Sequence, residues 1–248
     1  AGIPADRYPV YPLVTFSDLL AWTFIMLTHI PNVLTKEKLQ AALSIIARNP
    51  FVDGRQSAGK MAKQFKHNME LSADAGELSK LNNIVMGSLV QNPLYRSAAI
   101  PQRIATPYYA RYTEGMEYGD HVDDPVMGAG TLYRSDVSVT VFLSDPHSYE
   151  GGELVINTSF GEREVKLPAG DAVLYPSSSV HRVSRVTSGE RIVAVTWIQS
   201  LIRDAEKRAL LHDLNQAREH LLENAPGEPS TVQVNTSYIN LFRIWAEV

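Results

Sequence analysis

The chain has 248 residues, 44% hydrophobic and 20% charged, a composition that is ordinary for a globular protein and excludes wholesale disorder. The 23 Lys and Arg against 27 Asp and Glu leave a formal net charge of −4, so the basic surplus typical of nucleic-acid binding is missing. The absence of cysteine excludes disulfides, thiolate zinc sites, iron–sulfur clusters and a cysteine nucleophile, so any metal must be held by His, Asp or Glu.

The N-terminal region contains the only long apolar stretch, Leu19 to Ile30, which is shorter than the ~20 residues needed to cross a membrane. No basic residue immediately precedes it and no small-residue cleavage site follows it, so it differs from a signal peptide. We therefore expect a cytoplasmic protein with no membrane partner. Residues 1–25 have no clear periodicity and are interpreted as an N-terminal extension ahead of a fold that starts at Met26.

Two helices are predicted within residues 26–102, because apolar residues there recur at spacings of three and four. The first begins at Thr35, which can act as its N-cap, and ends at Pro50. The second covers residues 75–90 and is broken by Asn92-Pro93. We expect these helices to form a buttress for the β-rich region that follows.

Residues 103–201 consist of short apolar runs separated by turn residues, which is typical of a β-sandwich or barrel. Most of the separators contain glycine, which tolerates the positive φ of tight turns. About eight strands are predicted, a number that fits a jelly roll. They are Arg103–Tyr112, Tyr118–Val122, Ser135–Leu143, Glu153–Ile156, Glu162–Lys166, Ala172–Tyr175, Arg182–Val186 and Arg191–Gln199.

Residues 202–248 return to a helical period, with a loop at residues 224–231. The apolar side chains of this segment are predicted to pack against the rest of the fold. The same residues could instead form the contact of a homodimer.

The segment from Tyr112 to Asp123, YTEGMEYGDHVD, is the most informative for chemistry. His121 and Asp123 are two residues apart, so on a strand both side chains leave the same face and can reach one ion. A histidine and an aspartate at this spacing also occur on polar strand edges that bind no metal, so a third ligand is needed to indicate a metal site.

His181 is the best candidate for that third ligand, because it follows the turn-forming Pro176 and serines and begins a strand. Two imidazoles and one carboxylate form a facial triad, which leaves three coordination positions open and suits Fe(II) and oxygen chemistry. No catalytic side chain beyond this metal centre is predicted.

Arg191 begins the next strand, across a hairpin from the strand of His181. Its planar guanidinium could bind a carboxylate through two parallel hydrogen bonds, which a lysine could not do in the same geometry. The alternative is a solvated arginine at the mouth of a hairpin. This alternative is less favoured only when Arg191 is considered together with the triad.

The motifs YGDHVDDPVM, YEGGELVI, LPAGDAVLYPSSSVHRV and SGERIVAVTWIQS resemble those of the Fe(II)- and 2-oxoglutarate-dependent dioxygenases, in the prolyl 4-hydroxylase-like branch and more closely the bacterial PKHD-type hydroxylases. The resemblance spans nearly all of Met26 to Val248. It implies a double-stranded β-helix, iron ligation by His121, Asp123 and His181, and binding of the distal carboxylate of 2-oxoglutarate by Arg191.

The resemblance also implies the reaction and its partners. These are 2-oxoglutarate and O₂ as cosubstrates, succinate and CO₂ as products, hydroxylation of a primary substrate and ascorbate as a reductant. Tyr112 resembles a family position whose phenol lies near the cosubstrate, although a tyrosine in such a strand is often a core residue. The primary substrate is not indicated and could be a residue in a protein, a free amino acid or a siderophore-like molecule.

Two other functions remain as alternatives at this point. A cupin-like metal isomerase or epimerase uses a similar barrel with histidine-rich sites, but it has no need of Arg191 for 2-oxoglutarate. A sensor that retains iron and 2-oxoglutarate without productive turnover would share the same site residues.

Overall fold

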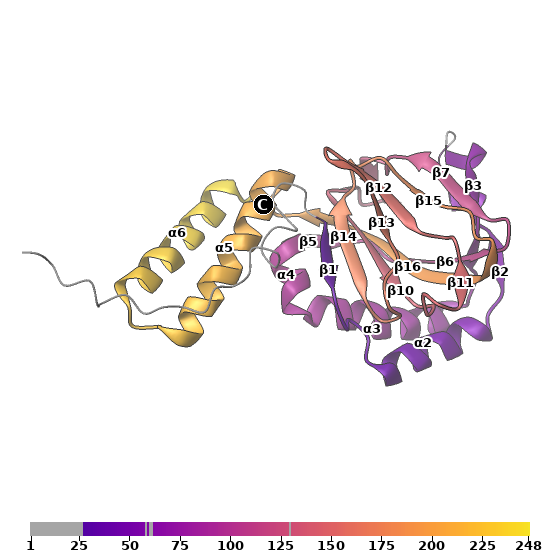
Figure 1. Cartoon of the computed structure of the whole chain (residues 1–248), viewed down its shortest axis with the longest axis horizontal. Helices are drawn as coiled ribbons and strands as arrows, with labels where there is room; N and C mark the ends of the chain where they lie inside the picture. Colours follow the sequence, from indigo (N-terminus) through magenta and orange to yellow (C-terminus); the bar gives the residue numbers. More distant parts are fainter. Residues whose placement is uncertain (1–26, 58, 60–61, 129) are drawn as a thin grey trace, which may run out of the picture.

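The computed structural model describes residues 27–57, 59, 62–128 and 130–248 (Figure 1), so the interpretation of residues 1–25 as an extension lies outside the described residues. The helices are α2 (Lys36–Ala47), α3 (Ala75–Gln91), α4 (Pro93–Ala99), α5 (Ala205–Asn224) and α6 (Pro229–Trp245), with two 3₁₀ helices, η1 (Gly54–Ser57) and η2 (Ala62–Gln64). The strands are β1 (Thr28–Ile30), β2 (Phe51–Asp53), β3 (Lys66–His67), β4 (Met69–Leu71), β5 (Pro101–Ile104), β6 (Tyr108–Thr113), β7 (Glu117–His121), β8 (Val126–Met127), β9 (Tyr133–Arg134), β10 (Val137–Phe142), β11 (Tyr149–Glu150), β12 (Leu154–Thr158), β13 (Gly161–Val165), β14 (Ala172–Pro176), β15 (His181–Val183) and β16 (Ser188–Ser200).

The helix starts follow the capping residues in the sequence. The Thr35 side chain accepts a hydrogen bond from the Lys38 backbone N–H at the start of α2. Asn92 was expected only to end the second helix, but its side chain also caps α4, whose first residue is Pro93. Proline suits a first helical position because the N–H that it lacks would have no partner there. The Asn92-Pro93 pair is therefore a junction between two helices.

Two antiparallel sheets face each other and form the predicted jelly roll. The larger has the order β1-β14-β10-β16-β6-β4-β2, with β5 and β11 also paired to β16, and the smaller has the order β13-β12-β15-β7-β3. The prediction of one strand over residues 103–112 is wrong, because the chain forms β5 and β6 with Pro107 between them, and proline cannot donate to a sheet ladder. The region expected to be helical also contributes β1 to β4.

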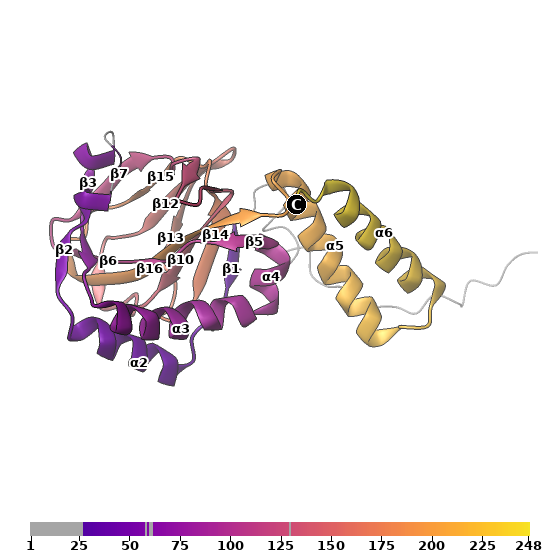
Figure 2. The same ribbon diagram turned by 180° about the vertical axis from the view of Figure 1, so that it is seen from behind.

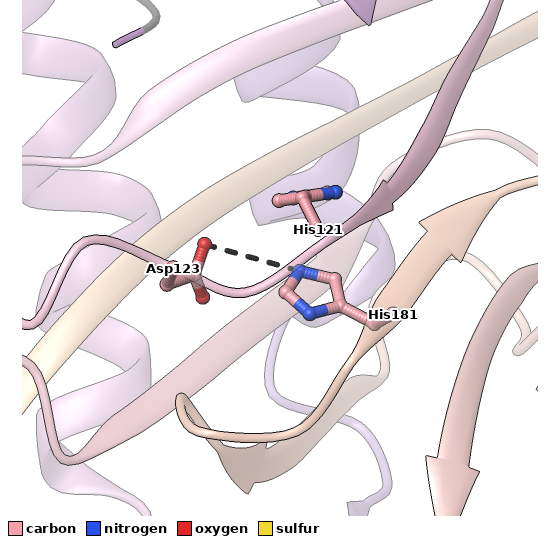
Figure 3. A group of neighbouring side chains, drawn as sticks. All are labelled: His121, Asp123 and His181. Carbon is pink, nitrogen blue, oxygen red and sulfur yellow. Dashed lines mark ion pairs between the residues drawn. The ribbon is translucent and has the colours of Figure 1, made fainter. Parts of the chain in front are cut away.

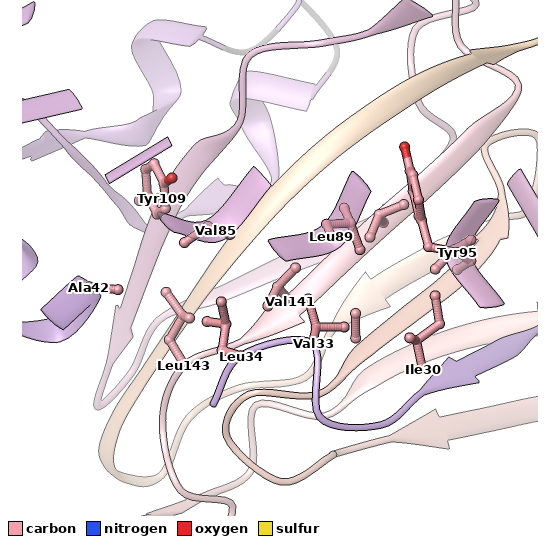
Figure 4. Close-up of a cluster of buried hydrophobic side chains, with 14 of the residues drawn as sticks. Ile30, Val33, Leu34, Ala42, Val85, Leu89, Tyr95, Tyr109, Val141 and Leu143 are labelled. Carbon is pink, nitrogen blue, oxygen red and sulfur yellow. The ribbon is translucent and has the colours of Figure 1, made fainter. Parts of the chain in front are cut away.

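The hydrophobic core has two layers, one on each face of the larger sheet. Helices α2, α3 and α4 cover its outer face (Figures 1 and 2). There, Val141 of β10 lies in one buried cluster with Val85 and Leu89 of α3 (Figure 4). Phe142, the next residue of β10, points to the opposite face and packs in the second layer, between the two sheets. Strand alternation thus directs one side of β10 to the helices and the other toward the interior of the roll.

Leu89→Ala is expected to lower the free energy of unfolding by about 2–5 kcal/mol, because Leu89 is fully buried and its truncation leaves a cavity under α3. Urea denaturation measures the change. The next residue offers a control, since Val90 is 37% exposed and Val90→Ala should change stability by no more than about 0.5 kcal/mol. Equal effects of the two substitutions would contradict the packing of α3 described here.

The C-terminal helices α5 and α6 pair with each other beside the β-roll (Figure 1). Leu211 of α5 packs with Ile100 and Ile202, and apolar side chains of α6 pack against this cluster. Among the described residues, no helix combines the length and the apolar character that a bilayer crossing requires.

Candidate functional site

The predicted triad residues come from two neighbouring strands of the smaller sheet. His121 is the last residue of β7, His181 is the first of β15, and the two are direct partners in the antiparallel register. Their ring centroids are 4.2 Å apart. Asp123 follows His121 by two residues, and its Oδ1 lies 3.8 Å from His181 Nε2 (Figure 3). The structure therefore brings together all three side chains that the motif spacing indicated.

Each of the three side chains offers one ligand atom, and these atoms lie within 4.8 Å of one another. The remaining polar atom of each side chain is held by another group. His121 Nδ1 lies 2.8 Å from the Gly119 carbonyl oxygen, and His181 Nδ1 lies 3.0 Å from the Ser179 carbonyl oxygen. A carbonyl can only accept, so each Nδ1 donates a proton and each Nε2 keeps its lone pair for a metal.

Asp123 is held in the same way, because Ser138 Oγ donates to its Oδ2 at 2.5 Å. The donor set is then two imidazole nitrogens and one carboxylate oxygen, the set that suits Fe(II) and leaves positions open. Burial lowers the pKa of His121, and the nearby His181 lowers it further. A neutral imidazole is the form that binds a metal, so these residues fit Fe(II).

Arg191 lies in the larger sheet, opposite Tyr112 in the register of β16 and β6. It is 1% exposed, and its guanidinium lies 5.0 Å from the centroid of the Tyr112 ring. Its Nε and Nη1 have no hydrogen-bond partner among the described residues. Burying a cation without hydrogen bonds is costly, so this arrangement favours an anionic ligand at Arg191. The alternative of a solvated arginine at a hairpin mouth is wrong. The predicted hairpin with the strand of His181 is also wrong, because β15 and β16 lie in different sheets.

A cavity of about 740 Å³ connects the triad to Arg191, within the range of small-molecule sites. It extends past Tyr112 and Thr140 to Trp197. Thr140 and Ser138 are two residues apart on β10 and so share a face, and the presence of Thr140 in the cavity lining shows that this face is the inner one. Trp197 of β16 also lines the cavity.

Strands β3 and β4 add a polar wall to the cavity that sequence reasoning missed. Lys66 and Glu70 are both buried and lie 2.6 Å apart, measured from Nζ to Oε1. Opposite Lys66 in the register, Tyr118 stacks on His121 with 3.7 Å between ring centroids. Strands of two and three residues are too short for alternation to be read, so no periodic signal marked these residues.

The chain matches two family models, the 2OG-Fe(II) oxygenase superfamily over residues 107–199 and the PKHD-type hydroxylase C-terminal domain over residues 205–247. A PKHD-type hydroxylase of Thioalkalivibrio sulfidiphilus is 48% identical over 224 residues, which cover 90% of this chain and all of the relative. One of Nitrosomonas eutropha is 44% identical with the same coverage.

The fold is similar to that of a 2OG-Fe(II) oxygenase-family oxidoreductase of Burkholderia pseudomallei, with a TM-score of 0.54, 15% identity and coverage of 70% of this chain and 85% of that one. A prolyl hydroxylase of Trichoplax adhaerens, solved with a hypoxia-inducible-factor peptide, gives a TM-score of 0.53 at 15% identity, covering 75% of this chain and 86% of that one. These similarities agree with a double-stranded β-helix.

Proposed function

Because this chain belongs to the PKHD-type hydroxylase family, we propose that His121, Asp123 and His181 are the ligands of its Fe(II) and that Arg191 binds its 2-oxoglutarate. The protein is an Fe(II)- and 2-oxoglutarate-dependent dioxygenase. When bound, these groups supply an oxidation in which O₂ and 2-oxoglutarate give succinate and CO₂ while a C–H bond of the substrate gains a hydroxyl. The observation that carries the assignment is three converging ligand atoms in one cavity with a buried, incompletely hydrogen-bonded guanidinium.

The protein residues contribute charge and position to this reaction. Two neutral imidazoles and one carboxylate leave a divalent cation with net positive charge, so the triad keeps its attraction for an anionic cosubstrate. Arg191 supplies a second positive charge in the lining of the same cavity, where its planar fork matches a carboxylate. A dicarboxylate that spans the two positions would have both ends neutralised.

Tyr112 supports the same binding mode from the neighbouring strand. Its ring packs over Arg191, and burial raises the pKa of its phenol to about 12. The hydroxyl therefore stays protonated at every usual assay pH and can donate a hydrogen bond. We assign it a minor contact to 2-oxoglutarate beside the ion pair with Arg191.

Tyr112→Phe is expected to weaken 2-oxoglutarate binding about 2- to 12-fold, because it removes one hydrogen bond worth about 0.5–1.5 kcal/mol and keeps the ring. Calorimetric titration of the Mn(II)-loaded protein with 2-oxoglutarate measures it, and the effect should be constant between pH 6 and 9. Tyr95→Phe is a control, since Tyr95 is fully buried in the helical layer, away from the cavity. An unchanged affinity in Tyr112→Phe would leave Tyr112 as a core residue.

The function itself is tested by succinate formation. Purified Fe(II)-loaded protein is given 2-oxoglutarate and O₂ with candidate peptides, amino acids and small molecules, and succinate is measured. A substrate should stimulate turnover severalfold above the uncoupled rate, and we propose ascorbate as the reductant that sustains activity after turnover without substrate. Slow turnover with no stimulating substrate would favour the sensor alternative, whereas the hydroxylase relatives give no support to an isomerase.

A further inference from the structure

Asp123 is hydrogen-bonded to one of a pair of buried hydroxyl groups, those of Ser138 and Ser177. Ser138 is fully buried on β10 and donates to Asp123 Oδ2, and its Oγ lies 2.8 Å from Ser177 Oγ. Ser177 is 2% exposed and directly follows β14. Because a carboxylate only accepts, the one proton of Ser138 points to Asp123, and Ser177 must then donate to Ser138. The direction of this two-hydroxyl chain is fixed.

The chain of hydrogen bonds continues to the C-terminal helices through one carbonyl group. The Asp136 carbonyl oxygen accepts from the Ser177 backbone N–H at 3.2 Å and from Arg208 Nη2 at 3.3 Å. Arg208 lies on α5 and is 1% exposed, and its Nη1 also donates to the carbonyls of Ile202 and Arg203. A buried guanidinium therefore joins the start of α5 to Asp136, the residue directly before β10, which carries Ser138.

We propose that Ser138 and Ser177 are positioning residues that restrict Asp123 to one metal-binding oxygen, and that α5, through Arg208, holds this pair in place. The inference rests on the proposed role of Asp123 as an iron ligand. It gives the C-terminal helices a task in the chemistry, although they contribute no residue to the lining of the cavity described above.

The physical reason is that Oδ2 can bind either the Ser138 hydroxyl or the metal. While Oδ2 accepts the hydrogen bond from Ser138, Oδ1 is the oxygen that faces His181 Nε2. A carboxylate freed from Ser138 can rotate and offer both oxygens, which occupies one of the positions that the cosubstrates need. Loss of the Ser138 hydroxyl should thus make the orientation of the Asp123 carboxylate less fixed and raise the number of protein ligand atoms.

The first test replaces Ser138 by alanine and measures Mn(II) affinity by calorimetry and the visible absorption of the Co(II)-loaded protein. Removing a residue that hydrogen-bonds to a metal ligand lowers metal affinity about 10- to 100-fold, and we expect a loss of this size. The visible absorption band of Co(II) should also become weaker, because the coordination number rises when both oxygens of Asp123 bind. Ser177→Ala should give a smaller loss with the same spectral direction, because Ser138 loses the donor that orients it.

Thr196→Val is the matched control for a lost buried hydroxyl. Thr196 is 1% exposed on β16 and donates to the Ala105 carbonyl, with no hydrogen bond to the Asp123 chain. It should lower thermal stability as Ser138→Ala does and leave Mn(II) affinity and the Co(II) spectrum unchanged. A purely structural role of Ser138 predicts that the two variants behave alike, and that result would overturn the proposal.

The second test concerns the link to α5. Arg208→Met should weaken Mn(II) binding about 3- to 10-fold. In the double variant with Ser138→Ala, the loss of Mn(II) affinity should be smaller than the sum of the two single losses in free energy, because both residues act through the same hydrogen bonds. His212→Ala is the control, since His212 anchors the same helix through Ser97 Oγ at 2.9 Å and does not touch Asp136. It should reduce stability without changing metal affinity.

The outcomes separate this inference from the proposed function. If the unsubstituted protein binds no Mn(II), the iron-ligand assignment itself fails. If it binds Mn(II) and Ser138→Ala binds equally well with an unchanged Co(II) spectrum, only the positioning role fails. Two results would overturn the link to α5: equal effects of Arg208→Met and His212→Ala on metal affinity, or additive effects of Arg208→Met and Ser138→Ala in the double variant. The positioning role of Ser138 and Ser177 would then stand alone.

Discussion

Replacing any one of His121, Asp123 and His181 by alanine is expected to abolish measurable Mn(II) binding. The site has three protein ligand atoms, and the loss of one leaves two whose positions are no longer set by a common ion. The effect should exceed the about 10- to 100-fold loss that follows removal of an outer hydrogen-bonding partner. Calorimetric titration with Mn(II), a redox-stable substitute for Fe(II), measures it.

His147→Ala is the control for this series, because His147 is exposed in a loop and is absent from the cavity lining. It should bind Mn(II) like the unsubstituted protein. Circular dichroism checks that each triad variant is folded, which is expected because the three side chains lie at or just beyond the ends of β7 and β15. Unchanged Mn(II) affinity in any triad variant would remove that residue from the metal site.

Arg191→Ala is expected to lower 2-oxoglutarate affinity by about 30- to 3,000-fold. This range follows from the roughly 2–5 kcal/mol lost when one half of a buried, charge-assisted pair is removed. Mn(II) affinity should change much less, since the guanidinium is not a ligand. Arg191→Lys should recover only part of the loss, because an ammonium keeps the charge and lacks the planar fork. Titration of the Mn(II)-loaded proteins with 2-oxoglutarate gives the three values.

The control for Arg191 is Arg185→Ala, which removes an arginine whose side chain is 60% exposed and pairs with Glu117 at the surface. Exposed pairs contribute little, so neither affinity should change. A 2-oxoglutarate affinity of Arg191→Ala within threefold of the unsubstituted protein would show that another group binds the distal carboxylate.

Local patterns in the sequence located much of the candidate site. The spacing of His121 and Asp123 has a direct physical meaning on a strand, and the turn residues ahead of His181 indicated where a second strand begins. Arg191 was expected across a hairpin from the strand of His181, and this prediction is wrong, because β15 pairs within the smaller sheet and β16 within the larger one. The structure still places all four residues around one cavity, because the two sheets face each other and not because of a hairpin.

The missed features depend on contacts between distant segments. Lys66 and Glu70 look like ordinary surface charges, and only the pairing of β3 with β7 and of β4 with β6 places them in the cavity wall. Ser138 could be assigned to a face, but alternation alone does not say which face is inward. The role of Arg208 requires knowledge of how α5 docks, which no periodicity contains.

The pairing of His121 with His181 also has a consequence for when the proposed metal site can form during folding. The two strands are neighbours in the sheet, yet β8 to β14 lie between them along the chain. Such long-range contacts form after local ones, because closing a long loop costs entropy. During synthesis, a chain that ends before His181 has only two of the three ligands. If these residues hold the iron as proposed above, the complete site is expected to form only once the roll can close.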